Sequence, residues 1–179
     1  KVIRNYTANT PNGIEAGEID LICVIENIIF IIEVKSTYYR TNQSEVFYHR
    51  DRTLRKSGIQ VRKKVEAIKD DLHLNKELRK RLGLTIETPQ IKGLIADTSL
   101  EFDHEYFAGF MKVSIEELLI ALADNAHFLC NQEKEFQLSF ESGTQLKFSS
   151  EYCTLYPSGF TGKEFLRVIE ESLVWAELD

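Results

Sequence analysis

Residues 17–36 read GEIDLICVIENIIFIIEVKS and contain the two strands on which the fold depends. The runs Glu18 to Ile25 and Ile28 to Thr37 are rich in Ile, Val and Phe, as β-strands typically are. The polar pair Glu26-Asn27 separates them and predicts a tight hairpin turn. The second run begins with five apolar residues and shows no polar alternation, so we expect that strand to be central and covered on both faces.

The hairpin places charged side chains inside strands, where apolar residues are expected. If the turn takes two residues, Asp20 lies directly across from Glu33. In the same register Glu18 lies across from Lys35, and these side chains share one face of the sheet. Two carboxylates about 5 Å apart repel each other unless a cation lies between them. The pattern therefore predicts a cation site, although a one-residue change of register would separate the pair.

A hard divalent ion is the expected occupant of this site. Mg²⁺ or Mn²⁺ takes oxygen ligands and tolerates bound water. Lys35 points to the same face as Glu33 and could hold a phosphate oxygen or help to deprotonate the attacking water. These residues favour a metal-dependent hydrolase of phosphodiester bonds. The alternative is an ion network on a half-exposed hairpin, and the apolar run before Glu33 argues against it.

The same residues resemble the PD-(D/E)xK motif of restriction-endonuclease-like nucleases. Asp20 stands in GEIDLI, Glu33 and Lys35 stand in IEVKS, and twelve residues separate the two acids. The motif is most similar to those of the Holliday-junction-resolvase-like and nuclease-related-domain branches. One departure is Ile19, which stands where the motif name has proline.

The resemblance implies an αβββαβ core and Mg²⁺-dependent cleavage of DNA or RNA. It implies Asp20 and Glu33 as metal ligands, the Val34 carbonyl as a further ligand, and Lys35 as the catalytic lysine. Some branches add a glutamine on the next helix, and Gln60 is the position that could match. A capping-box role with Ser57 is the alternative for Gln60.

The leading helix of such a core has no room in the 19 residues before Asp20. We expect it to lie upstream of Lys1, in a longer polypeptide, or its carboxylate to be replaced by Glu15. Glu18 is a further candidate for an accessory role, and an ordinary outer-strand charge paired with Lys35 is the alternative for it.

The rest of the chain predicts helices alternating with strands, and residues 1–13 are predicted to be irregular. Residues 38–53 are predicted to be a loop, and a helix is expected to follow with an apolar stripe at Val61, Val65, Ile68 and Leu72. The further predictions are a helix at 75–82 ending at Gly83, a strand at 91–97, a helix from Ser114 to about Leu129, a hairpin within 136–148, and a helix capped by Thr161.

This order predicts an α/β protein with a restriction-endonuclease-like mixed central sheet flanked by helices. We expect a nuclease core at 1–130 and a C-terminal α+β extension at 131–179, a hairpin and a helix packed on that core.

The net charge of −6 hides a strong asymmetry along the chain. Residues 1–96 hold 17 Lys and Arg against 12 Asp and Glu, whereas residues 97–179 hold 5 against 16. Cations interleave with aromatic side chains directly after the Lys35 strand, a pattern that suits phosphate contact and base stacking. The alternative is a solvated helix face. The candidate nucleic-acid contacts are Tyr38, Arg40, Arg50, Arg52, Arg55 and Lys56.

Composition sets the remaining expectations. The longest apolar run is far too short for a membrane span, and three widely spaced cysteines without metal-binding spacing favour a reducing, cytoplasmic compartment. We expect a nuclease acting on DNA, with RNA as the second choice, in a larger defence, repair or mobile-element protein that is a candidate homodimer. One alternative is a catalytically silent nuclease fold that binds nucleic acid or protein. The other is an α/β protein-interaction domain whose acidic C-terminal half binds a basic partner protein.

Overall fold

The computed structural model describes residues 1–9, 15–37, 40–124 and 154–176. It divides into two compact units, Lys1–Ile115 and Glu116–Asp179. The predicted domain boundary at residue 130 and the predicted hairpin within 136–148 lie outside the described residues. The first unit contains all the described residues of the predicted site.

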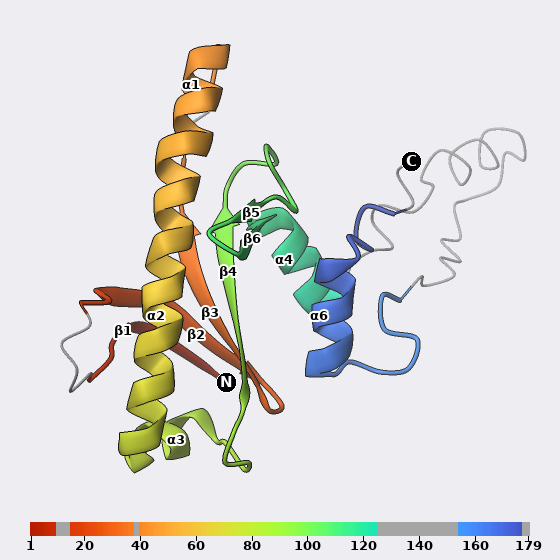
Figure 1. The fold of residues 1–179 in the computed structure, drawn as a ribbon. Helices are drawn as coiled ribbons and strands as arrows, with labels where there is room; N and C mark the ends of the chain where they lie inside the picture. The colour runs from red at the N-terminus through yellow and green to blue at the C-terminus, as the bar shows by residue number, and fades with distance from the viewer. Residues whose placement is uncertain (10–14, 38–39, 125–153, 177–179) are drawn as a thin grey trace, which may run out of the picture. The chain divides into compact units, whose positions relative to one another are not determined.

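The first unit is an α/β structure in which helices flank a mixed six-stranded sheet, as predicted for a restriction-endonuclease-like fold. The strand order is β1-β2-β3-β4-β6-β5 (Figure 1). Neighbouring strands are antiparallel except for the parallel pairs β3–β4 and β4–β6. The strands are β1 Val2–Thr7, β2 Glu18–Ile25, β3 Ile28–Lys35, β4 Gln90–Asp97, β5 Tyr106–Phe107 and β6 Phe110–Ser114.

The β2–β3 hairpin has the predicted turn and register. Its pairs run from Ile25 with Ile28 to Leu21 with Ile32. Every residue from 28 to 33 is buried, and β3 lies between β2 and β4. The prediction of a central, covered strand is therefore confirmed.

The prediction of irregular structure for residues 1–13 is wrong for β1. Residues 2–7 pair antiparallel with β2 and form one edge of the sheet. Most side chains of β1 are exposed, which explains the polar residues Arg4 and Asn5 in it. An edge strand with a solvated face lacks the apolar run by which a buried strand is recognised.

Helix and π-helix segments follow one another without a break from Gln43 to Leu74. They are α1 Gln43–Tyr48, the π-helix η1 His49–Leu54 and α2 Arg55–Leu74. The predicted loop at 38–53 is therefore wrong from Gln43 onward. Only His49 and Leu54 are buried in α1 and η1, so this stretch carries no apolar stripe that would have indicated a helix.

The helix also starts with a different cap from the predicted one. Asn42 is the N-cap of α1, and its side chain accepts a hydrogen bond from the Glu45 backbone N–H at 3.0 Å. Ser57 lies within α2, where its hydroxyl donates to the Thr53 carbonyl at 2.7 Å. The capping-box alternative for Gln60 is therefore wrong.

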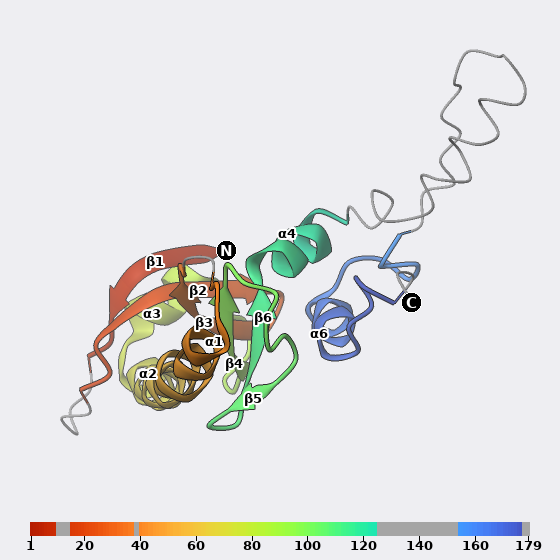
Figure 2. The ribbon, with the colours of Figure 1, turned by 90° about the horizontal axis from the view of Figure 1, so that it is seen from above.

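Helix α2 packs its apolar stripe against the sheet. Val61, Val65, Ile68 and Leu72 are buried in one cluster with residues from β2 and β3, among them Ile22, Val24, Ile29 and Ile31. Figure 2 shows α1 and α2 nearly end-on, on one face of the curved sheet. Helix α3, Lys76–Leu82, ends as predicted at Gly83, which has a positive φ of 70°. These contacts fix the position of α2 over the β2–β3 hairpin.

The remaining described elements test the C-terminal predictions in part. The strands β5 and β6 were not predicted. Helix α4, Ile115–Ala123, begins where Ser114 predicted a start, and its predicted end near Leu129 lies outside the described residues. Helix α6, Gly162–Glu170, has the predicted cap, because Thr161 accepts from the Glu164 N–H at 3.1 Å.

In the described part of the chain, no helix combines the length and apolar character needed to cross a membrane.

A tyrosine links the edge strand β1 to helix α2. The Tyr6 hydroxyl donates to Oδ2 of the fully buried Asp71 at 2.5 Å. The other oxygen of Asp71 has no hydrogen-bond partner among the described residues. Burial, followed by the hydrogen bond to Asp71, raises the pKa of Tyr6 to about 12.

We expect Tyr6→Phe to lower the free energy of unfolding by about 2 kcal/mol, because Asp71 Oδ2 then keeps the Asn9 backbone N–H as its one donor among the described residues. The raised pKa means that folding favours the protonated phenol. The stabilisation from Tyr6 is therefore complete below about pH 10 and is lost as the pH rises through 10 to about 12. Urea unfolding at pH 8 and pH 11 measures both effects, with exposed Tyr106→Phe as control. An equal alkaline loss in Tyr6→Phe and wild type would contradict this account.

Candidate active site

Asp20 lies where the β2 ladders are interrupted. The β1–β2 ladder pairs Arg4 with Leu21 and Tyr6 with Ile19, and skips Asn5 and Asp20 between them. Asn5 has a positive φ of 50°. On the other side, the β2–β3 pairs end at Leu21 with Ile32. The predicted ladder pair of Asp20 with Glu33 is therefore not formed by the backbone.

The Asp20 side chain continues the contact between the strands instead. Its Oδ2 accepts a hydrogen bond from the Val34 backbone N–H at 2.7 Å. The side chain is about one-third exposed. Asp20 is thus held against the end of β3 although its backbone leaves the ladder.

Glu33 and Lys35 form an ion pair at the end of β3. The Glu33 side chain is only 3% exposed, and Lys35 Nζ lies 2.5 Å from its Oε1. Lys35 Nζ also lies 3.4 Å from the side-chain oxygen of Gln60 on α2. Glu33 shares a sheet face with Ile29 and Ile31, which pack in the α2 cluster. The carboxylate is therefore the polar end of a hydrophobic face, under the same helix.

Lys64 on α2 joins Asp20, Glu33 and Lys35 in one cluster of charged side chains. It was not predicted as a site residue from the sequence. Its ammonium contacts Glu33 Oε2 closely and lies 3.3 Å from Asp20 Oδ1. The Lys64 side chain is only 4% exposed. Its position carried a signal, because Lys64 is three residues after Val61 and four before Ile68, and so falls on the buried stripe of α2.

The donor set suits a small hard cation. Asp20 and Glu33 already face one ammonium together, so their oxygens converge on a position of positive charge. Among the described residues, no group of three or more His, Cys, Asp or Glu side chains could hold a metal ion. A metal at this pair would draw on the two carboxylates, the Val34 carbonyl and water, and Mg²⁺ commonly binds proteins through one or two carboxylates.

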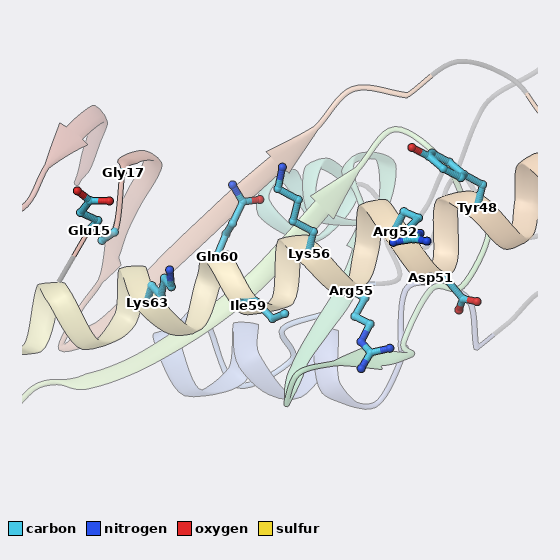
Figure 3. A pocket seen from close by; sticks show the side chains of 11 residues that line it. Glu15, Gly17, Tyr48, Asp51, Arg52, Arg55, Lys56, Ile59, Gln60 and Lys63 are labelled. Atoms are coloured by element: carbon cyan, nitrogen blue, oxygen red, sulfur yellow. The ribbon is translucent and has the colours of Figure 1, made fainter.

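A groove of about 810 Å³ opens beside this group, along α2 and η1 (Figure 3). One wall is the segment 15–17 before β2, and the other is the helix surface. The lining includes three of the predicted nucleic-acid contacts, Arg52, Arg55 and Lys56. Gln60 also lines the groove and contacts Lys35, which pairs with Glu33. The other lining side chains include Glu15, Tyr48, Asp51, Ile59 and Lys63. Cations outnumber anions in this lining, which suits a polyanion.

Other predicted residues lie elsewhere. Arg40 is 9% exposed and pairs with Glu101, and Arg50 pairs with Glu105 at 3.0 Å, so neither lines the groove. Glu18 is exposed and pairs in the β1 ladder with Thr7, whereas the described ion pair of Lys35 is with Glu33. Tyr38 lies outside the described residues. The roles predicted for these four residues remain predictions.

A buried network fixes the π-helix to the strand that follows α2. Asp97, fully buried at the end of β4, contacts Nε2 of His49 at 2.7 Å and accepts hydrogen bonds from Thr37 and Ser99. Burial lowers the pKa of His49, although Asp97 acts in the opposite direction. Since Asp97 pairs with Lys35 in the β3–β4 ladder, this network holds η1 close to Lys35 and Glu33 at the end of β3.

A hairpin-borne acidic pair, a neighbouring lysine and a basic helix groove on a mixed sheet define a protein of the restriction-endonuclease-like class. The family model described as nuclease-related domain matches residues 1–98, more than half of the chain. The chain therefore belongs to the nuclease-related domain family. Searches of curated proteins and of solved structures gave no match.

Proposed function

We propose that this domain is a metal-dependent nuclease that hydrolyses phosphodiester bonds in DNA, with Mg²⁺ or Mn²⁺ as its cofactor. The observation that carries the proposal is that the carboxylates of Asp20 and Glu33 converge on one positively charged group, the Lys64 ammonium. They do so beside Lys35 and a basic groove. Membership of the nuclease-related domain family supports the general class of function.

Each side chain has a distinct task in this proposal. Asp20 and Glu33 would hold the divalent ion. The chemistry that such an ion supplies is activation of water and neutralisation of the charge that develops on phosphorus. Lys35 would hold a phosphate oxygen, since its ammonium is fixed beside Glu33 and its side chain is still one-quarter exposed. Gln60 would orient Lys35 from the helix side.

The test is a cleavage assay with four substrates: supercoiled plasmid, linear duplex DNA, single-stranded DNA and single-stranded RNA. Each is incubated with Mg²⁺, with Mn²⁺ and with EDTA. We expect cleavage of DNA with either metal and none with EDTA. Cleavage of RNA alone would move the substrate to RNA, and cleavage in EDTA would overturn the metal requirement.

The groove predicts where the phosphate backbone binds. We expect the double variant Arg52→Ala/Lys56→Ala to weaken DNA binding roughly tenfold at moderate salt. The plot of log binding constant against log salt concentration should become less steep by about 2, because each lost phosphate contact reduces that slope by about 0.9. Fluorescence anisotropy in EDTA measures the affinity without cleavage. The matched control is Lys76→Ala/Lys80→Ala on α3, which removes the same charge from exposed positions away from the groove. Equal losses in both double variants would mean that only net charge matters.

One observation favours a second candidate, a silent nuclease fold that binds nucleic acid without cutting it. Lys64 places an ammonium between the carboxylates, and a site neutralised in this way needs no metal for stability. Under this candidate the groove variants still lose DNA affinity, but no metal yields cleavage products.

A further inference from the structure

Lys64 is an unusual residue for its position in the fold. Its nearest neighbours on the buried stripe of α2, Val61, Val65 and Ile68, are apolar and pack in one cluster with residues of β2 and β3. A buried ammonium is costly unless it is paired and hydrogen-bonded. Among the residues that the structure describes, Lys64 meets this requirement through Glu33 and Asp20 alone. Its placement is therefore explained by the carboxylate pair.

The charges of the group are already balanced. Asp20 and Glu33 contribute two negative charges, and Lys35 and Lys64 contribute two positive charges. A divalent ion added to this group, with both lysines in place, would leave two positive charges in excess. Because the Lys64 and Glu33 side chains are buried, that excess is poorly screened around them. One ammonium must therefore leave the carboxylates when the ion binds.

The geometry identifies which lysine leaves. Lys64 touches one oxygen of each carboxylate, which is the bridging position that an ion shared by the pair would take. Lys35 touches one oxygen of Glu33, Oε1, and lies 3.4 Å from the side-chain oxygen of Gln60, which lines the groove. Lys35 can therefore remain while the ion binds, whereas Lys64 and the ion need the same oxygens.

We propose that Lys64 is the resident counter-ion of Asp20 and Glu33 and competes directly with a divalent ion for them. The inference builds on the proposed metal-dependent function and adds a control on it. Lys64 stabilises the fold without metal and sets the concentration of Mg²⁺ or Mn²⁺ at which the site fills. The apparent affinity for the ion falls in proportion to the fraction of molecules whose carboxylates are free of the ammonium, so roughly 10% of free sites corresponds to a tenfold loss.

The experiment is calorimetric titration of Mn²⁺ into the full chain without nucleic acid. We expect Lys64→Met to bind Mn²⁺ about tenfold more tightly than wild type, since no ammonium has to be displaced. The control is Lys69→Met, which removes the same charge from an exposed position on the same helix and should leave the affinity unchanged. Lys64→Gln is the second variant, because its amide can still donate to a carboxylate if the methionine variant folds poorly.

The outcomes separate the competition from the proposed function. Tighter binding in the Lys64 variants supports both. Binding in those variants but none in wild type supports the competition and overturns the metal-dependent function. Equal or weaker binding in the Lys64 variants overturns the competition and leaves the function standing. An absence of Mn²⁺ binding in all proteins overturns both.

Discussion

Glu33→Gln is expected to reduce metal-dependent DNA cleavage by about a thousandfold. The substitution keeps the size of the side chain and removes the charge that a divalent ion needs. Metal catalysis lowers the barrier by several kcal/mol, and each 1.4 kcal/mol is about a factor of ten. Asp20→Asn is expected to show a loss of the same order, because both carboxylates face the same position of positive charge.

Single-turnover cleavage at saturating Mg²⁺ measures this loss. Glu66→Gln is the control, because Glu66 is exposed on α2, does not line the groove and is not part of the site around Asp20 and Glu33. Circular dichroism confirms that each variant is folded. A folded Glu33→Gln variant that cleaves within tenfold of the wild-type rate would show that Glu33 is no metal ligand.

Gly58→Ala is expected to destabilise the fold by about 2–3 kcal/mol, although alanine is the better helix former. In an exposed helix this change would stabilise by about 1 kcal/mol. A Cβ at Gly58 would overlap the carbonyl oxygen of Phe107 and lie 2.5 Å from its carbonyl carbon. The obstacle is backbone and cannot move aside as a side chain can, so α2 or the β5–β6 turn must shift.

Chemical denaturation of Gly58→Ala, compared with exposed Glu66→Ala on the same helix, measures this effect. The control variant is expected to stay within about 0.5 kcal/mol of wild type. An unchanged or raised stability of Gly58→Ala would place α2 further from β5 than the structure does.

The sequence predicted the parts of the fold that are apolar and locally determined. The β2–β3 hairpin followed from two apolar runs around Glu26-Asn27, and its register followed from the length of the turn. The C-terminal end of α3 followed from Gly83, and the start of α6 followed from Thr161, because the backbone and side-chain chemistry of these residues acts within one turn.

The parts that were missed depend on tertiary contacts. Strand β1 is a polar edge strand that is stable because β2 offers it a partner. Helices α1 and η1 bury little, and His49 is fixed by Asp97, which lies 48 residues further on. Lys64 looked like one of several cations on a solvated helix. Only the carboxylates opposite α2 reveal why a lysine occupies the buried stripe.

A crystal of the full chain soaked in Mn²⁺, with anomalous diffraction data, shows whether a divalent ion can take the position of the Lys64 ammonium. We expect an anomalous peak between Asp20 and Glu33, with the Lys64 ammonium moved off the two carboxylates. This expectation is contradicted if, at saturating Mn²⁺, no peak lies there and Lys64 still bridges the pair.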